Sequence, residues 1–414
     1  MSVRHRATAR ESPAKLPPAL PPAGTPNRVE ADGKQRLKSW ADYRSEFPVF
    51  KDATYLNSCS LGALGTPVRR AIERCLDLWS SMGASAWYGP WWDELGALRS
   101  SVARLLGAGG EDVALFPSIT AALSAVGSAF DYRLRPRVVI ADIDFPTVSY
   151  QWLAKRSRGV EVVFVHSPDG LTVPLEAFER AIGERTQLVA TSHVYFQSGA
   201  IQDVAALAQL AHARGALFLV DAYQSAGQMP LDVRAAGVDF LVTGGLKWLL
   251  GGPGIAYLYA RREVRTALRP EVVGWFAHRD QFAFDITHLE YADDARRFEG
   301  GTPAIAAVFA GRAGLEYVHE ITPTRLRARQ VELTSALVEA LRGAGLSPRL
   351  AGTVQEHAGI ITVPVPDPSA AVQALARERI IIDYRPGVVR LSPYFYNTVE
   401  DIDRAVAALR RHVR

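Results

Sequence analysis

Short runs of apolar and β-branched residues alternate with amphipathic segments through the middle of the chain. The runs cover residues 137–142, 160–165, 187–194, 216–222 and 239–244. Each run has the length and composition of a buried strand. Helical patterns such as LEAFERAIG and VAALAQLAHARG lie between several of them, and Gly215 ends the second pattern as a C-cap. Nearly continuous apolar strands joined by helices predict a mostly parallel sheet that helices cover on both faces.

Polar side chains follow two of these runs, at the sheet edge where ligands of parallel sheets bind. Asp221 is the first charged residue after ALFLV, and Gln224 comes three residues later. Another run leads into Lys247, within TGGLKWLLGGPG. Only six of the 47 basic residues are lysines, and Lys247 alone lies in an apolar stretch. Burial would lower the pKa of its amine and make it a nucleophile. A lysine whose stem packs on the next tryptophan and whose head reaches water explains the local sequence equally well.

Two further features fall at the same edge of the predicted sheet. Phe145 follows the first run, and VALFPSIT ends at Ser118 and Thr120 before a helical pattern. The free amides at the start of that helix are suited to hold an anion. Taken singly, each polar residue is better explained as a helix cap, and the phenylalanine as core. Together they supply an anion site, an aromatic ring, a carboxylate and an amine, which is the set that pyridoxal phosphate requires.

Length and composition limit the remaining possibilities. A chain of 414 residues, 48% hydrophobic and 22% charged, is typical of a soluble globular protein with two domains or one large and one small. No apolar run approaches the roughly 20 residues that span a bilayer, so no membrane association is expected. The net charge of +4 comes largely from MSVRHRATAR at the N-terminus, so no nucleic-acid partner is expected.

Cysteine usage and the N-terminal composition favour a cytoplasmic location. Cys59 and Cys75 show neither metal-ligand spacing nor a disulfide framework, so no metal is predicted. The N-terminus lacks the apolar segment of a secretory signal. Residues 1–36 are rich in proline and arginine and predict a disordered N-terminal tail.

Four motifs lie in a fixed order along the chain. They are DAYQSAG around Asp221, TGGLKWLLGGPGIAYLY around Lys247, RFEGGTPAI at 297–305 and RLSPYFYNTVEDID at 390–403. From about Tyr55 to the C-terminus the sequence resembles the class V aminotransferases. These are pyridoxal-phosphate enzymes of the aspartate aminotransferase fold that include cysteine desulfurases, kynureninases and isopenicillin N epimerase.

The resemblance implies an α/β fold of the aspartate aminotransferase type, known as fold type I of the pyridoxal-phosphate enzymes. Residues 37–300 would form a large cofactor-binding domain around a mostly parallel seven-stranded sheet. Residues 301–414 would form a smaller α+β domain at the C-terminus. The N-terminal segment of the large domain is a candidate for packing on the small one.

The resemblance also implies roles for the residues nearest the cofactor. Lys247 would form the Schiff base and then move the Cα proton as acid and base. Asp221 would pair with the pyridine nitrogen, and Gln224 would donate to the phenolic oxygen. Phe145 matches the position that stacks on the ring.

The phosphate is expected to have partners from two protomers. By the resemblance, the amides of Ile119 and Thr120 would bind it. Gly301 and Thr302 match a segment that reaches the phosphate from the neighbouring protomer, which implies a homodimer with shared active sites. Thr243 is the nearest hydroxyl to the place where relatives carry a further phosphate-binding residue.

Two matches concern the substrate. Arg390 matches the arginine that binds the substrate α-carboxylate through its two-pronged geometry. Asn57 lies in YLNSCSLGALGTP, which resembles a kynureninase loop near the site entrance. Both residues are therefore expected to contact a small amino-acid substrate.

Three stretches depart from the family or stand outside its pattern. ERIIIDYRPGVVRLS has no cysteine where desulfurases carry a mobile one, which makes persulfide chemistry improbable. Tyr195 and Phe196 stand where relatives carry small polar groups. The aromatic cluster from Trp87 to Trp92 is explained equally well as a substrate pocket, a dimer interface or a helix start.

The sequence thus predicts an enzyme that uses pyridoxal phosphate to deprotonate the Cα of an α-amino acid or a similar metabolite. Aminotransferase and kynureninase-like or C–S lyase reactions are favoured, and epimerisation is the alternative within the family. From another class, the alternative is a catalytically silent relative that binds the cofactor or a partner protein. The combination of Lys247, Asp221 and Arg390 argues against a silent protein, since binding alone does not require all three.

Overall fold

The computed structural model describes residues 38–412. The predicted N-terminal tail, residues 1–36, lies outside the described residues. The helices are α1 (Trp40–Ser45), α2 (Thr66–Met82), α3 (Pro90–Leu106), α4 (Ile119–Ser128), α5 (Pro146–Leu153), α6 (Leu175–Ala181), α7 (Val204–Ala213), α8 (Arg262–Arg265), α9 (Ile305–Ile321), α10 (Pro323–Gly343), α11 (Pro368–Arg377) and α12 (Val399–His412). The strands are β1 (Thr54–Tyr55), β2 (Val113–Phe116), β3 (Arg137–Ala141), β4 (Glu161–Val165), β5 (Thr186–Ser192), β6 (Leu217–Asp221), β7 (Phe240–Gly244), β8 (Ala256–Ala260), β9 (Ile361–Pro364), β10 (Ile380–Ile381), β11 (Asp383–Arg385) and β12 (Val388–Leu391).

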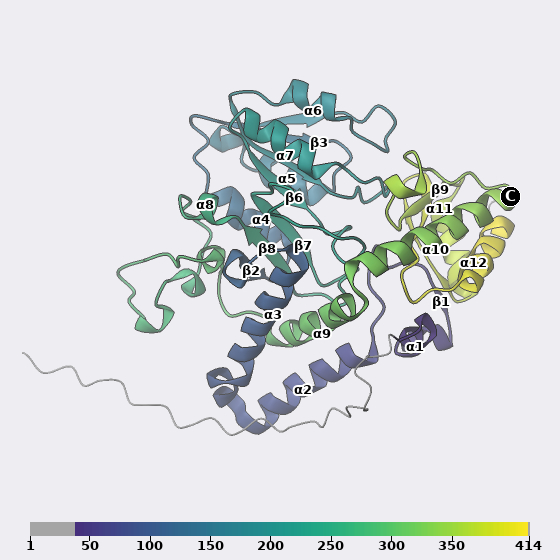
Figure 1. Cartoon of the computed structure of the whole chain (residues 1–414), viewed down its shortest axis with the longest axis horizontal. Helices are drawn as coiled ribbons and strands as arrows, with labels where there is room; N and C mark the ends of the chain where they lie inside the picture. Colours follow the sequence, from purple (N-terminus) through teal and green to yellow (C-terminus); the bar gives the residue numbers. More distant parts are fainter. Residues whose placement is uncertain (1–37, 413–414) are drawn as a thin grey trace, which may run out of the picture. The chain divides into compact units, whose positions relative to one another are not determined.

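A seven-stranded sheet in the order β2-β8-β7-β6-β5-β3-β4 forms the centre of the structure (Figure 1). Strands β7, β6, β5, β3 and β4 pair in parallel, and β8 runs antiparallel to both β7 and β2. The five runs expected from the sequence are β3 to β7, and the prediction of a mostly parallel sheet is confirmed. Since β2 points the same way as the parallel strands, the ends of β2, β3, β5, β6 and β7 meet at one edge.

Helices cover both faces of this sheet, as its apolar strands require. Side chains alternate between the faces along each strand. Val189 and Val220 belong to a core with α3, α7 and α9, whereas their neighbours Ala190 and Leu219 belong to a second core with α4 and α5. Burial on both faces explains why the strands read as continuous apolar runs.

The C-terminal part of the chain builds a core of its own. Strands β11, β12 and β9 form an antiparallel sheet in that order. Buried residues of α10, α11 and α12 pack with β9 and β12 in a third core. Among residues 38–412, no helix combines the length and the apolar character needed to cross a membrane.

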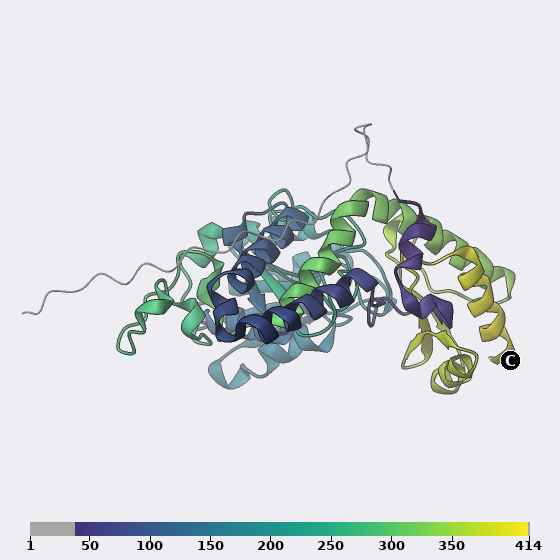
Figure 2. The same cartoon turned by 90° about the horizontal axis from the view of Figure 1, so that it is seen from below.

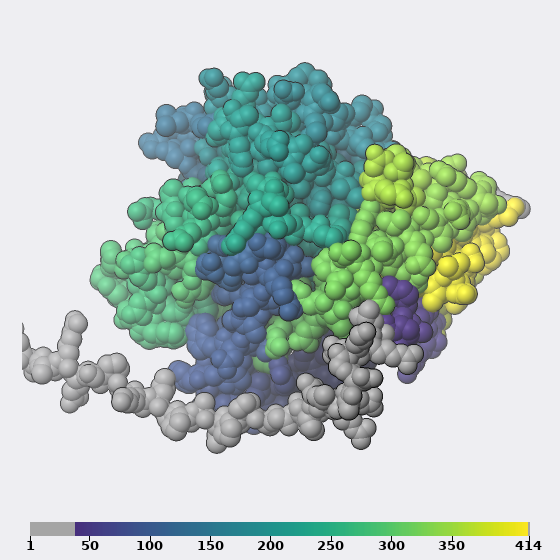
Figure 3. All heavy atoms as spheres, viewed as in Figure 1, coloured from purple at the N-terminus to yellow at the C-terminus, as the bar shows by residue number. Residues whose placement is uncertain are grey.

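The first described residues lie beside this C-terminal part. Strand β1 pairs in parallel with β10, and Arg44 of α1 forms an ion pair with Asp401 of α12 at 2.6 Å. Figures 2 and 3 show the purple N-terminal residues next to the yellow and green C-terminal ones. The loop after β1 is thereby drawn to β12, where Asn57 forms a β-bridge with Ser392. The division at residues 300 and 301 stays a prediction.

The loop between β7 and β8 carries Lys247 and is held rigidly. The Gly245 amide donates to the Ile255 carbonyl at 3.0 Å, and the Gly251 amide donates to the Gly245 carbonyl at 2.7 Å. On the other side the loop touches α9 backbone to backbone, because a Cβ at Gly251 would lie 2.6 Å from the Gly311 Cα. The glycines of this stretch therefore permit a close approach that fixes the lysine.

Replacing Gly251 by alanine is expected to lower the free energy of unfolding by about 1–3 kcal/mol, the usual cost of overpacking an interior. Helix α9 would have to move away from the loop. Thermal unfolding of the purified protein measures the change. Gly96→Ala in α3 is the matched control, since its Cβ would meet no atom within 4 Å and alanine favours a helix. An unchanged midpoint for Gly251→Ala would contradict the close contact.

Candidate active site

A cavity of about 150 Å³ lies at the edge where the ends of β2, β3, β5, β6 and β7 meet. It brings together residues that are far apart in the sequence. The predicted site residues that line it are Ile119, Thr120, Phe145, Asp221, Gln224 and Lys247. Amine, carboxylate, aromatic ring and helix N-terminus thus face one space.

Lys247 presents its amine to aromatic surfaces in this cavity. Its Nζ lies 4.4 Å from the centre of the Tyr223 ring and 5.9 Å from the centre of the Phe145 ring. Burial lowers the pKa of Lys247 to about 8, against the attraction of the Asp221 carboxylate, which acts to raise it. With a pKa of about 8, roughly a tenth of the amine is uncharged at pH 7. The uncharged form is the one that attacks a carbonyl carbon.

Asp221 is a buried carboxylate with an unused oxygen. Its Oδ1 accepts a hydrogen bond from the Tyr223 amide at 2.8 Å, and no other residue among 38–412 donates to it. Burial raises the pKa of this carboxyl, while the Tyr223 amide and the Lys247 ammonium act to lower it. The free oxygen is available to a cationic N–H donor inside the cavity.

The N-terminus of α4 supplies an anion site. Ser118 caps the helix, because its Oγ accepts from the Ala121 amide at 3.2 Å. The amides of Ile119 and Thr120 precede the first intrahelical bond and have no acceptor within the helix. Helix α4 carries no charged side chain, so the partial positive charge of its N-terminus is not neutralised from within.

Phe145 is 40% exposed, which core packing does not explain. The Phe145 ring packs on the Phe196 ring edge to face, with the two ring centroids 5.1 Å apart. The preceding Asp144 is buried and fixes the turn by accepting from the Ser192 amide at 2.7 Å and the Ala141 amide at 3.1 Å. Burial raises the pKa of Asp144 to about 7, against these hydrogen bonds.

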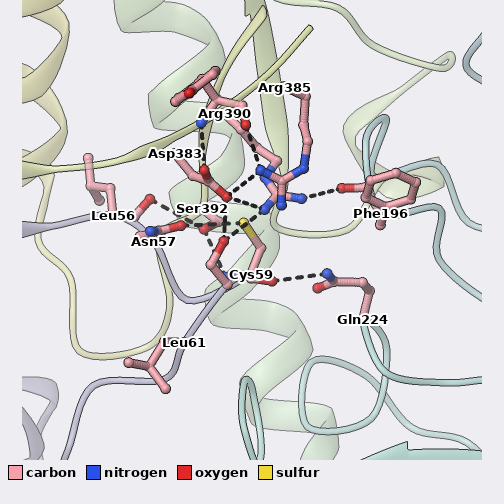
Figure 4. A network of polar contacts seen from close by, with 12 residues as sticks. Leu56, Asn57, Cys59, Leu61, Phe196, Gln224, Asp383, Arg385, Arg390 and Ser392 are labelled. Atoms are coloured by element: carbon pink, nitrogen blue, oxygen red, sulfur yellow. Dashed lines mark hydrogen bonds and ion pairs between the residues drawn. The ribbon is translucent and has the colours of Figure 1, made fainter. Parts of the chain in front are cut away.

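Gln224 lines the cavity and also ties two loops together. Its Nε2 donates to the Cys59 carbonyl at 3.0 Å, and its Oε1 accepts from the Trp248 indole N–H at 2.8 Å. One proton of the amide nitrogen stays available toward the cavity. Figure 4 shows the contact with Cys59, a buried residue that the chain order alone placed far from the site.

Arg390 lies behind the cavity and not on its wall. Its side chain is 1% exposed, and Nη1 donates to the carbonyl of Phe196, which does line the cavity. The other nitrogen, Nη2, contacts Ser60 and Asp383 (Figure 4). The predicted carboxylate-binding residue is thus adjacent to the site, and both of its terminal nitrogens are bonded to the chain itself.

A model of the family described as aminotransferase class-V matches residues 91–405. The chain belongs to the class-V aminotransferase family. It is 36% identical over 369 residues to an uncharacterized aminotransferase, YcbU, of Bacillus subtilis strain 168, which covers 88% of this chain and 95% of the relative. It is 27% identical over 401 residues to a kynureninase of Bacillus cereus strain ATCC 10987, with 92% and 93% coverage. The predicted family, its enzymatic character and its cofactor, pyridoxal phosphate, are confirmed at this level.

The fold of this chain is also that of a solved structure. The apo structure of a cysteine desulfurase from Thermococcus onnurineus NA1 superposes with a TM-score of 0.81 at 23% identity. The match covers 92% of this chain and 99% of the desulfurase. The predicted fold class is therefore confirmed.

Like Arg390, the predicted residues Thr243 and Asn57 do not line the Lys247 cavity. The Thr243 hydroxyl donates to the Ala222 carbonyl at 3.3 Å and is buried. Asn57 lies in the loop after β1, where its Oδ1 accepts from the Cys59 thiol at 3.8 Å (Figure 4). Among the described residues, neither side chain contributes to the wall of the Lys247 cavity.

Gly301 and Thr302 line a different cavity, of about 590 Å³, together with Glu299 and the start of α4. Glu299 is buried and pairs with Arg99 at 2.5 Å, which fixes the segment before the glycine. The described chain does not bring Gly301 or Thr302 to the Lys247 cavity. Their assignment to a neighbouring protomer stays a prediction.

The sequence did not single out Tyr223 or the hydroxyl side chains of Thr147 and Ser192, which all line the cavity. Tyr223 lies within the DAYQSAG motif, so its place beside Asp221 was a usable signal. Ser192 ends β5 and was equally accessible from the strand pattern. Thr147 follows the proline that begins α5 and had no distinguishing feature.

The aromatic cluster of Trp87, Trp91 and Trp92 does not line the Lys247 cavity. Trp92 packs on Phe276 and Phe282 with centroid distances of 5.6 and 5.9 Å. The cluster therefore joins the start of α3 to the segment between β8 and α9.

Because burial lowers the pKa of Lys247, its reactivity in the apoprotein is expected to rise through a midpoint near pH 8. Asp221→Asn should move the midpoint to lower pH, since the lost carboxylate acts to raise that pKa. Competitive labelling with trace acetic anhydride, quantified by peptide mass, measures both midpoints, with the exposed Lys51 as internal reference. A midpoint near the ordinary lysine value of 10.5 would contradict the buried amine.

Proposed function

We propose that this enzyme uses pyridoxal phosphate to deprotonate the Cα of an α-amino acid, and that it is an aminotransferase. The observation that carries the proposal is the single cavity shared by Lys247, Asp221, Phe145 and the N-terminus of α4. These groups fit the cofactor because the polar ones are not fully used by the chain itself. The amine is partly uncharged, Asp221 has an unused oxygen, and the amides that begin α4 have no acceptor.

When bound, pyridoxal phosphate supplies an electrophilic carbonyl and an electron-withdrawing ring. The amides of Ile119 and Thr120 would hold its phosphate, and Phe145 would cover one face of the ring. Asp221 would hold a proton at the ring nitrogen by accepting a hydrogen bond from it. This task requires the carboxyl group of Asp221 to be ionised. The Tyr223 amide and the Lys247 ammonium both favour the ionised form of Asp221 against the effect of burial, which raises its pKa.

Lys247 has two successive tasks in this proposal. Its uncharged Nζ would hold the carbonyl carbon of the cofactor until a substrate amine takes its place. The freed Nζ then takes the proton from the substrate Cα and returns it at another atom. A pKa near 8 suits both steps, because the amine both gives and accepts a proton near neutral pH.

The relative from Bacillus subtilis that is named an aminotransferase supports the first candidate. A lyase that cleaves the bond between the substrate Cβ and its substituent is the second candidate. The kynureninase relative, which has a similar coverage, supports it. Desulfuration through a mobile cysteine is not proposed. The segment 379–392 has no cysteine, and the thiol of Cys59 is fully buried.

A homodimer with shared active sites is part of the proposal. The cavity that contains Gly301 and Thr302 opens beside the start of α4, where the phosphate of the same chain would lie. A second protomer that presents this segment would supply further donors to that phosphate. Sedimentation of the purified protein tests this arrangement, and a monomer that retains the cofactor would contradict it.

The experiment that tests the proposed reaction mixes the cofactor-loaded enzyme with pools of L-amino acids and no keto acid. We expect stoichiometric conversion of the cofactor to pyridoxamine phosphate, identified by mass spectrometry. Lys247→Ala should lose the conversion by several orders of magnitude, because positioned acid and base catalysis contributes about 10²–10⁴-fold alone. Lys155→Ala is the matched control, since that lysine lies outside the cavity.

The remaining outcomes separate the alternatives. Consumed amino acid with unchanged cofactor would replace the aminotransferase by the lyase. Inverted amino acid with unchanged cofactor would indicate an epimerase. No change in either, with Lys247→Ala equal to the parent, would leave a silent binding protein.

A further inference from the structure

Arg390 and Asp383 face each other across two strands. They are directly opposed in the antiparallel register of β11 and β12, so their side chains lie on the same face of the sheet. Asp383 Oδ2 accepts from Arg390 Nη2 at 2.5 Å and from the Ser60 hydroxyl at 2.5 Å. Arg385 lies two residues along β11, and its Nη1 donates to the same oxygen at 2.8 Å. One carboxylate oxygen therefore holds two guanidinium groups and a hydroxyl (Figure 4).

The occupied nitrogen of Arg390 is the one that any two-point contact needs. A carboxylate binds a guanidinium either at the end, through Nη1 and Nη2, or at the side, through Nε and Nη2. Nη2 has two protons, and Ser60 and Asp383 are placed to accept them. Nε is buried and has no partner among the described residues. A substrate carboxylate can therefore bind Arg390 at two points only by displacing a group from Nη2.

Asp383 is the group that a substrate carboxylate would displace. Two carboxylates on one nitrogen repel each other, whereas the Ser60 hydroxyl is neutral and also able to donate. Asp383 has another partner to retain it, because Arg385 uses only Nη1 among residues 38–412 and keeps its Nε and Nη2 donors free. Arg385 is also the more exposed arginine, with 28% of its side chain accessible against 1% for Arg390.

The surrounding charges agree with this division. Burial acts to raise the pKa of Asp383, but the Ser60 hydroxyl, Arg390 and Arg385 outweigh it and lower that pKa. Asp383 is therefore a carboxylate at neutral pH. It neutralises part of the positive field that the two arginines exert on Lys247, whose pKa they act to lower.

We propose that Asp383 is a resident competitor for the substrate carboxylate on Arg390, and that Arg385 takes up Asp383 when the substrate binds. The pair Asp383 and Arg385 thereby sets how strongly the enzyme prefers an amino acid to the corresponding amine. This inference rests on the proposed function, in which Arg390 binds the substrate carboxylate. Asp383 and Arg385 act through Arg390 and are positioning residues.

The test measures binding through the absorbance of the cofactor in the holoenzyme. The twenty coded L-amino acids are screened with the parent enzyme. The probes are the amino acid with the largest spectral change and the amine that lacks only its carboxylate. Dissociation constants are then compared for the parent, Asp383→Asn, Arg385→Gln, the double variant and Arg390→Gln. Tyr384→Phe, on the same strand between the two residues, is the matched control.

Asp383→Asn is expected to tighten binding of the amino acid about tenfold, because a charge-assisted bond to Arg390 is replaced by a weaker neutral one. Arg385→Gln should weaken it by a similar factor in the parent. The same substitution should have no effect in the Asp383→Asn background, as a double-mutant cycle requires of a coupled pair. Binding of the amine should be unchanged throughout, and Tyr384→Phe should match the parent with both probes.

Other results overturn distinct parts of the account. Unchanged or weaker amino-acid binding in Asp383→Asn, with a large loss in Arg390→Gln, would overturn the competitor alone. An effect of Arg385→Gln that persists in the double variant would show that Arg385 contacts the substrate directly and would overturn its role as acceptor. Unchanged binding in Arg390→Gln, or no spectral response to any amino acid, would overturn the proposed function and this inference with it.

Discussion

The attraction between the Lys247 ammonium and the Asp221 carboxylate, which are both largely buried, is the interaction on which the site depends. Burial alone would push each group toward its neutral form, and each charge acts against that effect on the other. The balance leaves an amine with a pKa of about 8 beside a carboxylate with a free oxygen. Without Asp221 the lysine would be a weaker base, and without Lys247 the buried aspartate would be harder to ionise.

The fold supports this balance by fixing the backbone of the loop that carries Lys247. Strand β8 returns antiparallel to β7, so the two ends of the loop at residues 245–255 lie side by side, and the Gly245 amide donates to the Ile255 carbonyl. Helix α9 closes it from one side, and the Gly62 amide donates to the Leu246 carbonyl at 2.9 Å from the other. The loop after β1 is thus bonded to two parts of the site. Its Gly62 amide bonds the lysine loop, and its Cys59 carbonyl accepts from Gln224. Arg390 reaches the same region because β1 lies beside the C-terminal strands.

Much of this arrangement was predictable from the sequence because it follows from periodicity. Continuous apolar runs predict buried parallel strands, and the ends of such strands converge, so Asp221, Phe145 and Lys247 could be placed together. The ion pair between Arg390 and Asp383 could not be predicted, because it depends on the register of a short antiparallel sheet. The contact between Cys59 and Gln224 could not be predicted either, because separation along the chain does not show which loop lies at the sheet edge. The hydrogen bond from the Thr243 hydroxyl to a backbone carbonyl was likewise not visible in the sequence, and the predicted role of Thr243 in phosphate binding stays a prediction.

One lysine, made reactive by burial, holds the cofactor in the proposed function. The most direct measurement reduces the purified, cofactor-loaded protein with borohydride and locates the modified lysine by peptide mapping. The account predicts that the label lies on Lys247 alone, although Lys38, Lys51 and Lys155 are also present among the described residues. A label distributed over those lysines, or absent from Lys247, would contradict it.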